Sequence, residues 1–168
     1  MASSKIFSNI ILLFNFFVLL HGNYKPSNCM KLKYQAQIDA LNPSLENFAE
    51  VENKAAFRWT FEDINHSSNF LPVTLTNPTY KVPFTIFTGW ALSFFETKEQ
   101  GENRLKYLSE DKPRAYRKLG THISEGLLHR NLGICEKKCD SDGHFNFFDY
   151  EEVSFVPYFK VIEQVGTL

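Results

Sequence analysis

The sequence lacks the features by which most enzymes and nucleic-acid-binding proteins are recognised. Acidic and basic side chains nearly cancel to a formal net charge of −1, and no run of lysine or arginine matches a phosphate backbone. It contains no glycine-rich phosphate loop, no G-x-S-x-G elbow and no H-E-x-x-H zinc motif. His122 and Glu125 lie one helical turn apart, a spacing common on solvated helix faces. We therefore predict neither nucleic-acid binding nor an enzyme activity.

Long hydrophobic runs are also scarce. The run IFSNIILLFNFFVLL, which follows Lys5, has 15 residues, whereas a membrane-spanning helix needs roughly 20. A short positive segment, an apolar run and then His21-Gly22 are typical of a secretory signal peptide. We predict that residues 1–22 are a signal peptide and that residues 23–168 form one secreted, extracellular domain with no membrane segment.

Cysteine is limited to three positions, Cys29, Cys135 and Cys139. Thiols tend to pair in an oxidising compartment, and an odd number leaves one over. On a helix, Cys135 and Cys139 would share a face with nearly parallel Cβ directions, which suits a mutual disulfide badly. The sequence therefore predicts a disulfide from Cys29 to either Cys135 or Cys139, which braces the two ends of the domain.

The apolar spacing is mostly helical. It predicts helices over 29–41 and 43–60, a third from 84 to about 110, a fourth from about 113 to 135 and a last one over 150–165. Residues 63–83 are rich in Asn, Ser, Thr and Pro and predict a long loop. The expected fold is a mainly α single domain of about five helices with this long central loop.

Aromatic residues are abundant between the loop and residue 95. Phe87, Trp90, Ala91, Phe94 and Phe95 recur at helical spacing, a pattern typical of a buried stripe. The same side chains offer an alternative, a pocket for a small apolar ligand among Phe87, Trp90 and Phe94.

One modification motif lies within the long loop. Asn65-His66-Ser67 fits the acceptor pattern for N-glycosylation. In a secreted chain, Asn65 is therefore a candidate glycosylation site, which would make the protein a glycoprotein.

Acidic side chains gather in KKCDSDGHFNFFDYEEV, residues 137–153. With Gly143 at the sixth position of a loop, Asp140, Asp142, Asn146 and Asp149 fall on the third, fifth, ninth and twelfth positions. This spacing resembles an EF-hand over about 114–165, and the short carboxylate at the last position is similar to the loops of dockerin modules. The resemblance implies a helix–loop–helix that binds Ca²⁺ through Asp140, Asp142, the His144 carbonyl, Asn146 and Asp149.

Two features of the loop bear on that resemblance. Lys138 occupies the first position, where it brings a cation and no acceptor, so the expected affinity for Ca²⁺ is only millimolar. A second register starts at Asp140 and ends at Glu151, but it places Phe145 where the turn needs glycine.

Two other interpretations of the same segment stay open. The acidic residues can form a plain turn, with Asp149 as the N-cap of the last helix. Alternatively, two thiols and two imidazoles could bind Zn²⁺ tetrahedrally; these are His129, Cys135, Cys139 and His144.

Three functions are therefore compatible with the sequence. The first is a secreted helical protein with weak calcium binding at the EF-hand-like loop. The second is a metal-free effector-type protein that binds an unknown protein partner. The third is a carrier of a small apolar ligand.

Overall fold

The computed structural model describes residues 30–77, 86–112 and 116–165. The chain divides into a unit of residues 1–30 and a unit of residues 31–168, and the fold below is that of the second unit. The predicted signal peptide and Cys29 lie outside the described residues. None of the described helices is long and apolar enough to cross a membrane.

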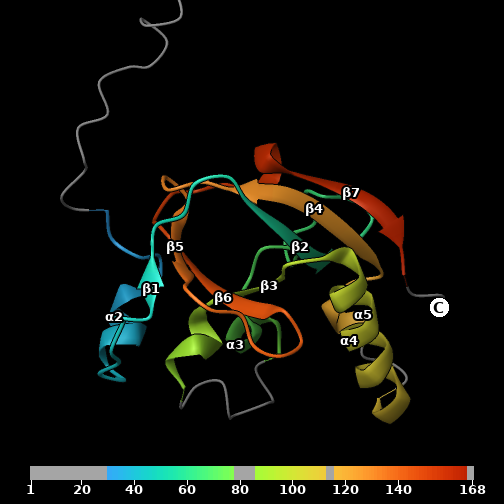
Figure 1. Cartoon of the computed structure of the whole chain (residues 1–168), viewed down its shortest axis with the longest axis horizontal. Coiled ribbons are helices and arrows are strands. Elements are labelled where there is room, and N and C mark those ends of the chain that lie inside the picture. Colours follow the sequence, from blue (N-terminus) through green and yellow to red (C-terminus); the bar gives the residue numbers. More distant parts are fainter. Residues whose placement is uncertain (1–29, 78–85, 113–115, 166–168) are drawn as a thin grey trace, which may run out of the picture. The chain divides into compact units, whose positions relative to one another are not determined.

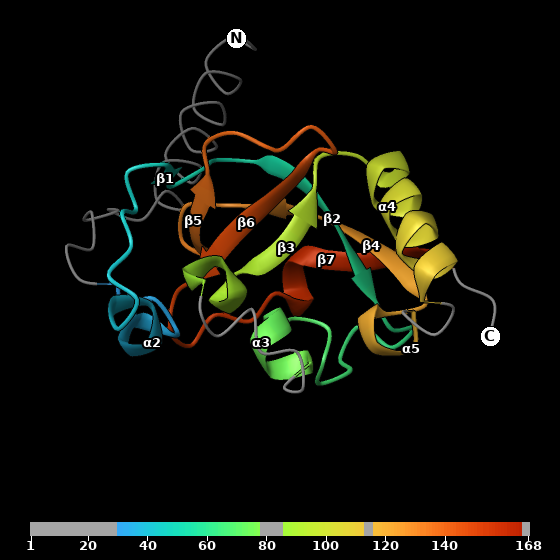
Figure 2. The ribbon, with the colours of Figure 1, turned by 90° about the horizontal axis from the view of Figure 1, so that it is seen from below.

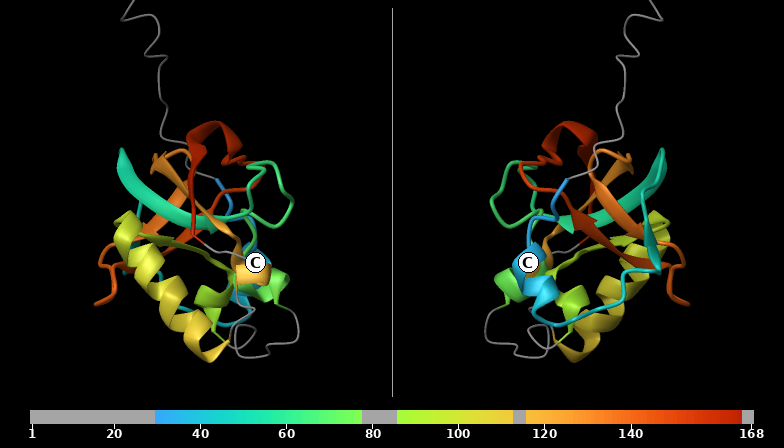
Figure 3. Two further views of the ribbon diagram at one scale, coloured as in Figure 1. Left: turned by 90° about the vertical axis from the view of Figure 1, so that its right-hand side faces the viewer. Right: turned by 90° about the vertical axis from the view of Figure 1, so that its left-hand side faces the viewer.

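The described chain forms a seven-stranded antiparallel sheet, so the prediction of a mainly α fold is wrong (Figure 1). The order of the strands is β1-β5-β6-β3-β2-β4-β7. The sheet is strongly curved, as the end-on views of Figure 3 show. The strands are β1 (Phe48–Ala49), β2 (Lys54–Thr60), β3 (Leu92–Phe95), β4 (His122–Leu128), β5 (Gly133–Glu136), β6 (His144–Asp149) and β7 (Phe159–Gln164).

The helices of the described chain are mostly short. They are α2 (Gln35–Asp39), α3 (Val73–Thr76), α4 (Lys98–Asp111) and α5 (Tyr116–Leu119), with 3₁₀ turns η2 (Phe87–Trp90) and η3 (Val156–Tyr158). Four of the five predicted helices therefore contain strands. The segment 43–60 holds β1 and β2, and the segment from 84 to about 110 holds η2, β3 and most of α4. The segment from 113 to 135 holds α5, β4 and part of β5, and the segment 150–165 holds η3 and β7.

Alternation of side chains explains why the central segments are strands. In β6, Phe145 and Phe147 are fully buried, whereas His144 and Asn146, which alternate with them, are partly exposed. A period of two residues places these pairs on opposite faces of the sheet. The alternation covers only a few residues in each strand, so a search for spacings of three and four residues finds chance helical matches among the many phenylalanines.

Two clusters of buried side chains form the core. The larger cluster contains Phe94, Phe145, Phe147, Phe155 and Phe159 together with small and aliphatic residues. The second contains Ile38, Phe48, Phe148 and Tyr150, with Phe87 and Trp90 packed against it. Phe147 and Phe148 are consecutive in β6 and enter different clusters, because neighbouring strand residues point to opposite faces.

The longest described helix, α4, packs against β2, β3 and β4 (Figure 2). It begins with a capping box, in which the Thr97 hydroxyl accepts a hydrogen bond from Gln100 N at 3.3 Å and the Gln100 side chain accepts one from Thr97 N at 2.9 Å. The side chain of Gln100 also covers Gly143, in the turn before β6. A Cβ at Gly143 would overlap Gln100, and the backbone there has φ of +71°, so this turn requires glycine.

Candidate functional site

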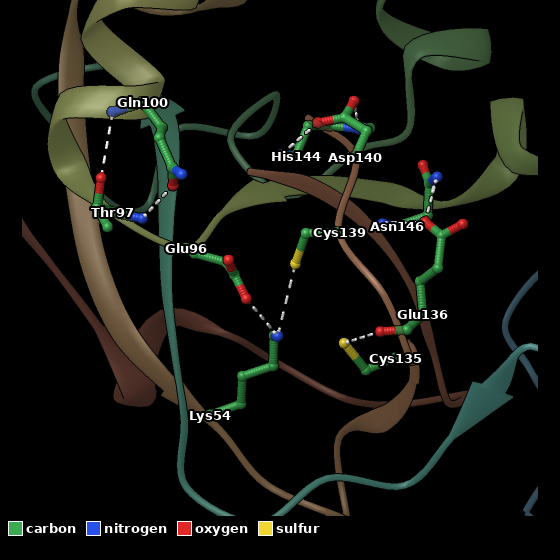
Figure 4. Close-up of polar contacts among 10 residues, drawn as sticks. All are labelled: Lys54, Glu96, Thr97, Gln100, Cys135, Glu136, Cys139, Asp140, His144 and Asn146. Atoms are coloured by element: carbon green, nitrogen blue, oxygen red, sulfur yellow. Dashed lines mark hydrogen bonds and ion pairs between the residues drawn. The ribbon is translucent and has the colours of Figure 1, made fainter. Parts of the chain in front are cut away.

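In the acidic loop between β5 and β6, the Asp140 carboxylate is hydrogen-bonded by backbone N–H groups of the same segment. Asp140 Oδ1 accepts a hydrogen bond from the backbone N–H of His144 at 2.9 Å (Figure 4) and another from that of Asp142 at 2.9 Å. Gly143 N donates to the Asp140 carbonyl. These contacts close a tight turn between two strands. The segment expected to resemble a helix–loop–helix is therefore, around this loop, a β-hairpin.

The predicted calcium ligands are not brought together. Asp142 is exposed and lies 3.5 Å from Arg104, and Asn146 donates to Glu136 on β5 at 2.9 Å. Asp149 lies at the far end of β6, about five residues from the turn, which corresponds to roughly 16 Å along a strand. Among the described residues, no group of three or more His, Cys, Asp or Glu side chains is placed to hold a metal ion.

Asp149 has its own partner in the structure. It is 2% exposed, and its Oδ2 lies 3.1 Å from Lys33 Nζ. Burial raises the pKa of Asp149, and Lys33 opposes that rise. The Asp149 carboxylate thus forms an ion pair with Lys33, in the N-terminal segment of the described fold. It does not act as the N-cap of a helix, as one interpretation of the sequence expected. Calcium binding by the loop stays a prediction. The structure does not bring together the complete set of ligands that the resemblance to an EF-hand implies.

The zinc set is not assembled either. His129 Nδ1 lies 3.5 Å from a carboxylate oxygen of Glu52, and His144 Nδ1 lies 3.5 Å from Asp140. Neither histidine belongs to a metal-binding group in the described part of the chain.

The prediction of a disulfide is contradicted for the described cysteines. Cys135 and Cys139 are both free thiols, and Cys29 lies outside the described residues. Lys54 Nζ lies 3.8 Å from Cys139 Sγ and 3.4 Å from Glu96 (Figure 4). Burial raises the pKa of Cys135 to about 12 and, with a hydrogen bond to Glu96, that of Cys139 to about 11. Both groups are therefore protonated thiols at neutral pH and poor nucleophiles.

The exposed side chain of Asn65 lies in a turn between β2 and α3. Its backbone N–H and its side-chain amide both donate to Asp63 Oδ1, at 2.9 and 3.1 Å. Glycosylation at Asn65 stays a prediction.

A cavity of about 770 Å³ lies between the sheet and the segments that carry α3, α4 and α5. Its sheet wall is formed by Arg58 and Trp59 of β2, Ser93 and Phe95 of β3, and His144 of β6. The helical side supplies apolar groups, Leu71, Val73, Leu108 and Leu119, and three cations, Arg104, Lys112 and Lys118. The volume is within the range of small-molecule sites, roughly 300–1,000 Å³.

Arg58 is held firmly at the wall of the cavity. Its Nε, Nη1 and Nη2 donate to the carbonyls of Asn69, Ser93 and Leu71 at 2.6, 2.7 and 2.8 Å. Burial lowers the pKa of Arg58 to about 10, and Asp149 is the carboxylate that opposes this shift. Arg58 therefore remains charged at neutral pH, and it forms no ion pair with any carboxylate of the described residues.

His144 lies beside two of the cavity's charged groups. Burial lowers the pKa of His144; Asp140 and Glu136 act to raise it, and Arg104 and Arg58 lower it further. The ring also packs edge-on against Phe95, with the centroids 5.7 Å apart. At neutral pH the imidazole is therefore uncharged, because its pKa lies below the usual value of about 6.5.

Trp59 and Phe95 form the aromatic part of the wall. Their ring centroids are 5.0 Å apart, and the Trp59 indole N–H donates to the Gly101 carbonyl of α4 at 2.9 Å. The ring orientation is therefore fixed by α4. The cavity thus combines an aromatic surface with one fixed cation, Arg58.

The region around Phe87, Trp90 and Phe94, where the sequence suggested a ligand pocket, is not part of the cavity and belongs to the packed core. Phe94 is fully buried in the larger core cluster, and Phe87 and Trp90 pack against the second cluster. None of the three lines the cavity.

The residues that sequence analysis missed are Arg58, Trp59 and Arg104. One signal was present for Arg58, a single cation inside the otherwise uncharged stretch AAFRWT.

A second, shallower hollow of about 530 Å³ lies over β2, β4 and β7. Its charged side chains Glu125 and Lys160 pair with each other at 2.8 Å. The charges of these two side chains therefore cancel, whereas the described lining of the cavity has more positive than negative charge.

Comparisons of this chain with known protein families, with curated proteins and with solved structures find no match. The chemistry of the cavity is thus the available guide to function.

Proposed function

We propose that this protein is a secreted carrier that holds one small, partly apolar molecule in the cavity between the sheet and α3, α4 and α5. The observation that carries the proposal is the cavity itself, which has about 770 Å³ of space. Its wall joins the ring surfaces of Trp59 and Phe95 to the aliphatic side chains of Leu108 and Leu119. Burial of apolar ligand surface against such a wall is the main source of affinity for small molecules.

Two features favour binding over catalysis at this site. Both described thiols have raised pKa values and lie outside the cavity lining. His144 is the one imidazole among the described lining residues; its ring packs against Phe95, and its polar side-chain contact is with Asp140. The fixed side chains of Trp59, Phe95 and Arg58 are suited to recognition of a ligand.

The first experiment measures binding of a neutral apolar dye, phenylnaphthylamine, to the purified protein. The chain has two tryptophans, so the variant Trp90→Phe leaves Trp59 as the reporter. We expect dye fluorescence to rise with saturation and Trp59 emission to fall, because the dye binds beside that ring. Absence of a saturable signal, both with this dye and with the anionic dye of the same aromatic body used below, would contradict the carrier function.

A matched pair of substitutions locates the dye. Leu108→Trp fills part of the cavity, whereas Leu127→Trp places the same ring in the shallower hollow over β2, β4 and β7. We expect Leu108→Trp to weaken dye binding by about tenfold, equivalent to about 1.4 kcal/mol, and Leu127→Trp to leave it unchanged. Equal effects of the two substitutions would place the dye outside the cavity.

The proposal of secretion has a separate test. N-terminal sequencing of protein collected from the culture medium is expected to start near Asn23, because the apolar run and Lys5 are typical of a signal peptide. Recovery of the chain with Met1 intact would contradict this part of the proposal.

A further inference from the structure

The cavity contains more positive than negative charge. Among the described residues that line it, Arg58, Arg104, Lys112 and Lys118 are cationic, and Asp140 is the one carboxylate. The whole chain has a formal net charge of only −1, so this positive excess is local to the cavity. A local excess of cations attracts anions, and the attraction is strongest at Arg58, because Lys112 and Lys118 are exposed to solvent and are screened by it.

Arg58 is the fixed member of this set. A guanidinium has five N–H donors, and three of them are used by the carbonyls of Asn69, Leu71 and Ser93. The other two N–H groups of Arg58, one on Nη1 and one on Nη2, donate to no described group. A charge that is partly removed from water without a counter-ion is unfavourable. An oxyanion in the cavity would supply both the acceptors and the opposite charge.

Two further polar groups share the cavity lining with Arg58. Arg58, Arg104 and His144 all line the cavity, and the charges of both guanidinium groups act to lower the pKa of His144. Arg104 is half-exposed, and its contact with the exposed carboxylate of Asp142 is a loose one, at 3.5 Å. Such an ion pair is weak in water, so Arg104 can exchange Asp142 for a ligand at little cost.

We propose that the carried molecule is an organic acid whose oxyanion headgroup, a carboxylate or a phosphate, binds between Arg58 and Arg104 beside His144. This inference rests on the proposed carrier function and adds the class of ligand. The apolar body of the acid lies against Trp59, Phe95 and Leu108. Two parallel N–H groups of a guanidinium match two oxygens of either headgroup, which is why both are included.

The test compares two dyes that share an aromatic body. Anilinonaphthalene sulfonate carries an oxyanion, and phenylnaphthylamine does not. We expect the sulfonate to bind about tenfold more tightly, and the preference to shrink as salt is added. Equal affinity would overturn the oxyanion inference and leave the carrier function intact. Absence of binding by both dyes would instead overturn the carrier function.

Substitutions then assign the preference to the cavity. Arg104→Gln is expected to weaken binding of the sulfonate about fivefold and to leave the neutral dye unchanged, because it removes one cation beside the headgroup. Arg130→Gln is the control, since Arg130 is half-exposed, pairs with Glu52 and does not line the cavity. Asp140→Asn is expected to strengthen binding of the sulfonate, because it removes the one carboxylate of the lining. A sulfonate affinity that responds equally to Arg104→Gln and Arg130→Gln would contradict the assignment.

The class of headgroup is resolved by displacement of the neutral dye. Dodecanoate and dodecyl phosphate are compared with dodecanol, which has the same alkyl body without a charge. Tighter binding of either acid than of the alcohol supports the inference and identifies the preferred headgroup. Displacement by the alcohol at the same concentration as both acids would overturn it.

Discussion

The two tryptophans of this chain have different surroundings, although both are partly buried. Trp90 packs against Tyr34, with the ring centroids 5.5 Å apart, beside the second core cluster. Trp59 packs against Phe95 on one side and lines the cavity on another. The helical spacing of aromatic residues singles out Trp90, yet the open space lies at Trp59. Aromatic density in a sequence therefore marks the filled core, whereas a cavity forms where distant segments leave space.

The largest effect is expected from Arg58→Leu, which removes the cation of the Trp59 region. Three carbonyls lose their charged donor, and we expect the free energy of unfolding to fall by about 2–4 kcal/mol. Chemical denaturation measures this loss. Arg130→Leu is the control and is expected to lose less than about 1 kcal/mol, because its pair with Glu52 is half-exposed. Equal losses would mean that the contacts of Arg58 do not support the cavity wall.

The pair Trp90→Ala and Trp59→Ala tests the contrast itself. We expect Trp90→Ala to lower the free energy of unfolding by about 2–3 kcal/mol, because it truncates a ring packed on the core, and to leave dye affinity unchanged. Trp59→Ala is expected to weaken dye binding by about tenfold. Loss of dye affinity in Trp90→Ala, with the protein still folded, would reverse the assignment of the two regions.

A smaller effect is expected from pH, through His144. Its pKa in the folded protein is lowered, mainly by burial, while Asp140 and Glu136 oppose and Arg104 and Arg58 assist that shift. The unfolded chain therefore binds a proton first as the pH falls below about 6.5, and the stability of the fold declines until the folded pKa is reached. His144→Asn should remove this part of the decline, as measured by denaturation at several pH values. An unchanged pH dependence in the variant would contradict the burial of His144.

The smallest effect is expected from calcium. The Asp140 carboxylate is already used by two backbone N–H groups, and Asp149 lies at the far end of β6. Several millimolar Ca²⁺ is therefore expected to change the melting temperature by less than about 1 °C, both in the native protein and in Lys138→Asp. A clear rise that is lost in Asp142→Ala would show that the loop binds calcium after all.

The sequence allowed part of this structure to be predicted. The aromatic stripe correctly identified Phe94 and Phe95 as buried residues. Its helical interpretation was wrong, because η2 and β3 divide the stripe and both ring positions are reached from an extended strand. Short strands with a few alternating residues carry a weak local signal, and their pairing depends on partners far away in the sequence.

The candidate site was less predictable than the core. Arg58 meets the carbonyl of Ser93 only because β2 pairs with β3, and it meets those of Asn69 and Leu71 only because the intervening chain turns back. Arg104 reaches the same cavity from α4. The acidic loop suggested a metal site because its carboxylates are close together in the sequence. In the structure, Asp140 accepts hydrogen bonds from the backbone of the hairpin and Asp149 pairs with Lys33.

The most direct test of the carrier account is a two-dimensional proton–nitrogen NMR titration of the labelled protein with anilinonaphthalene sulfonate. The two indole N–H signals are assigned with Trp90→Phe. The account predicts that the signals of the Trp59 indole and of Arg58 Nε–H shift progressively to saturation, while the Trp90 indole signal stays in place. A shift of the Trp90 signal, or no shift of either indole under conditions in which dye fluorescence saturates, would contradict it.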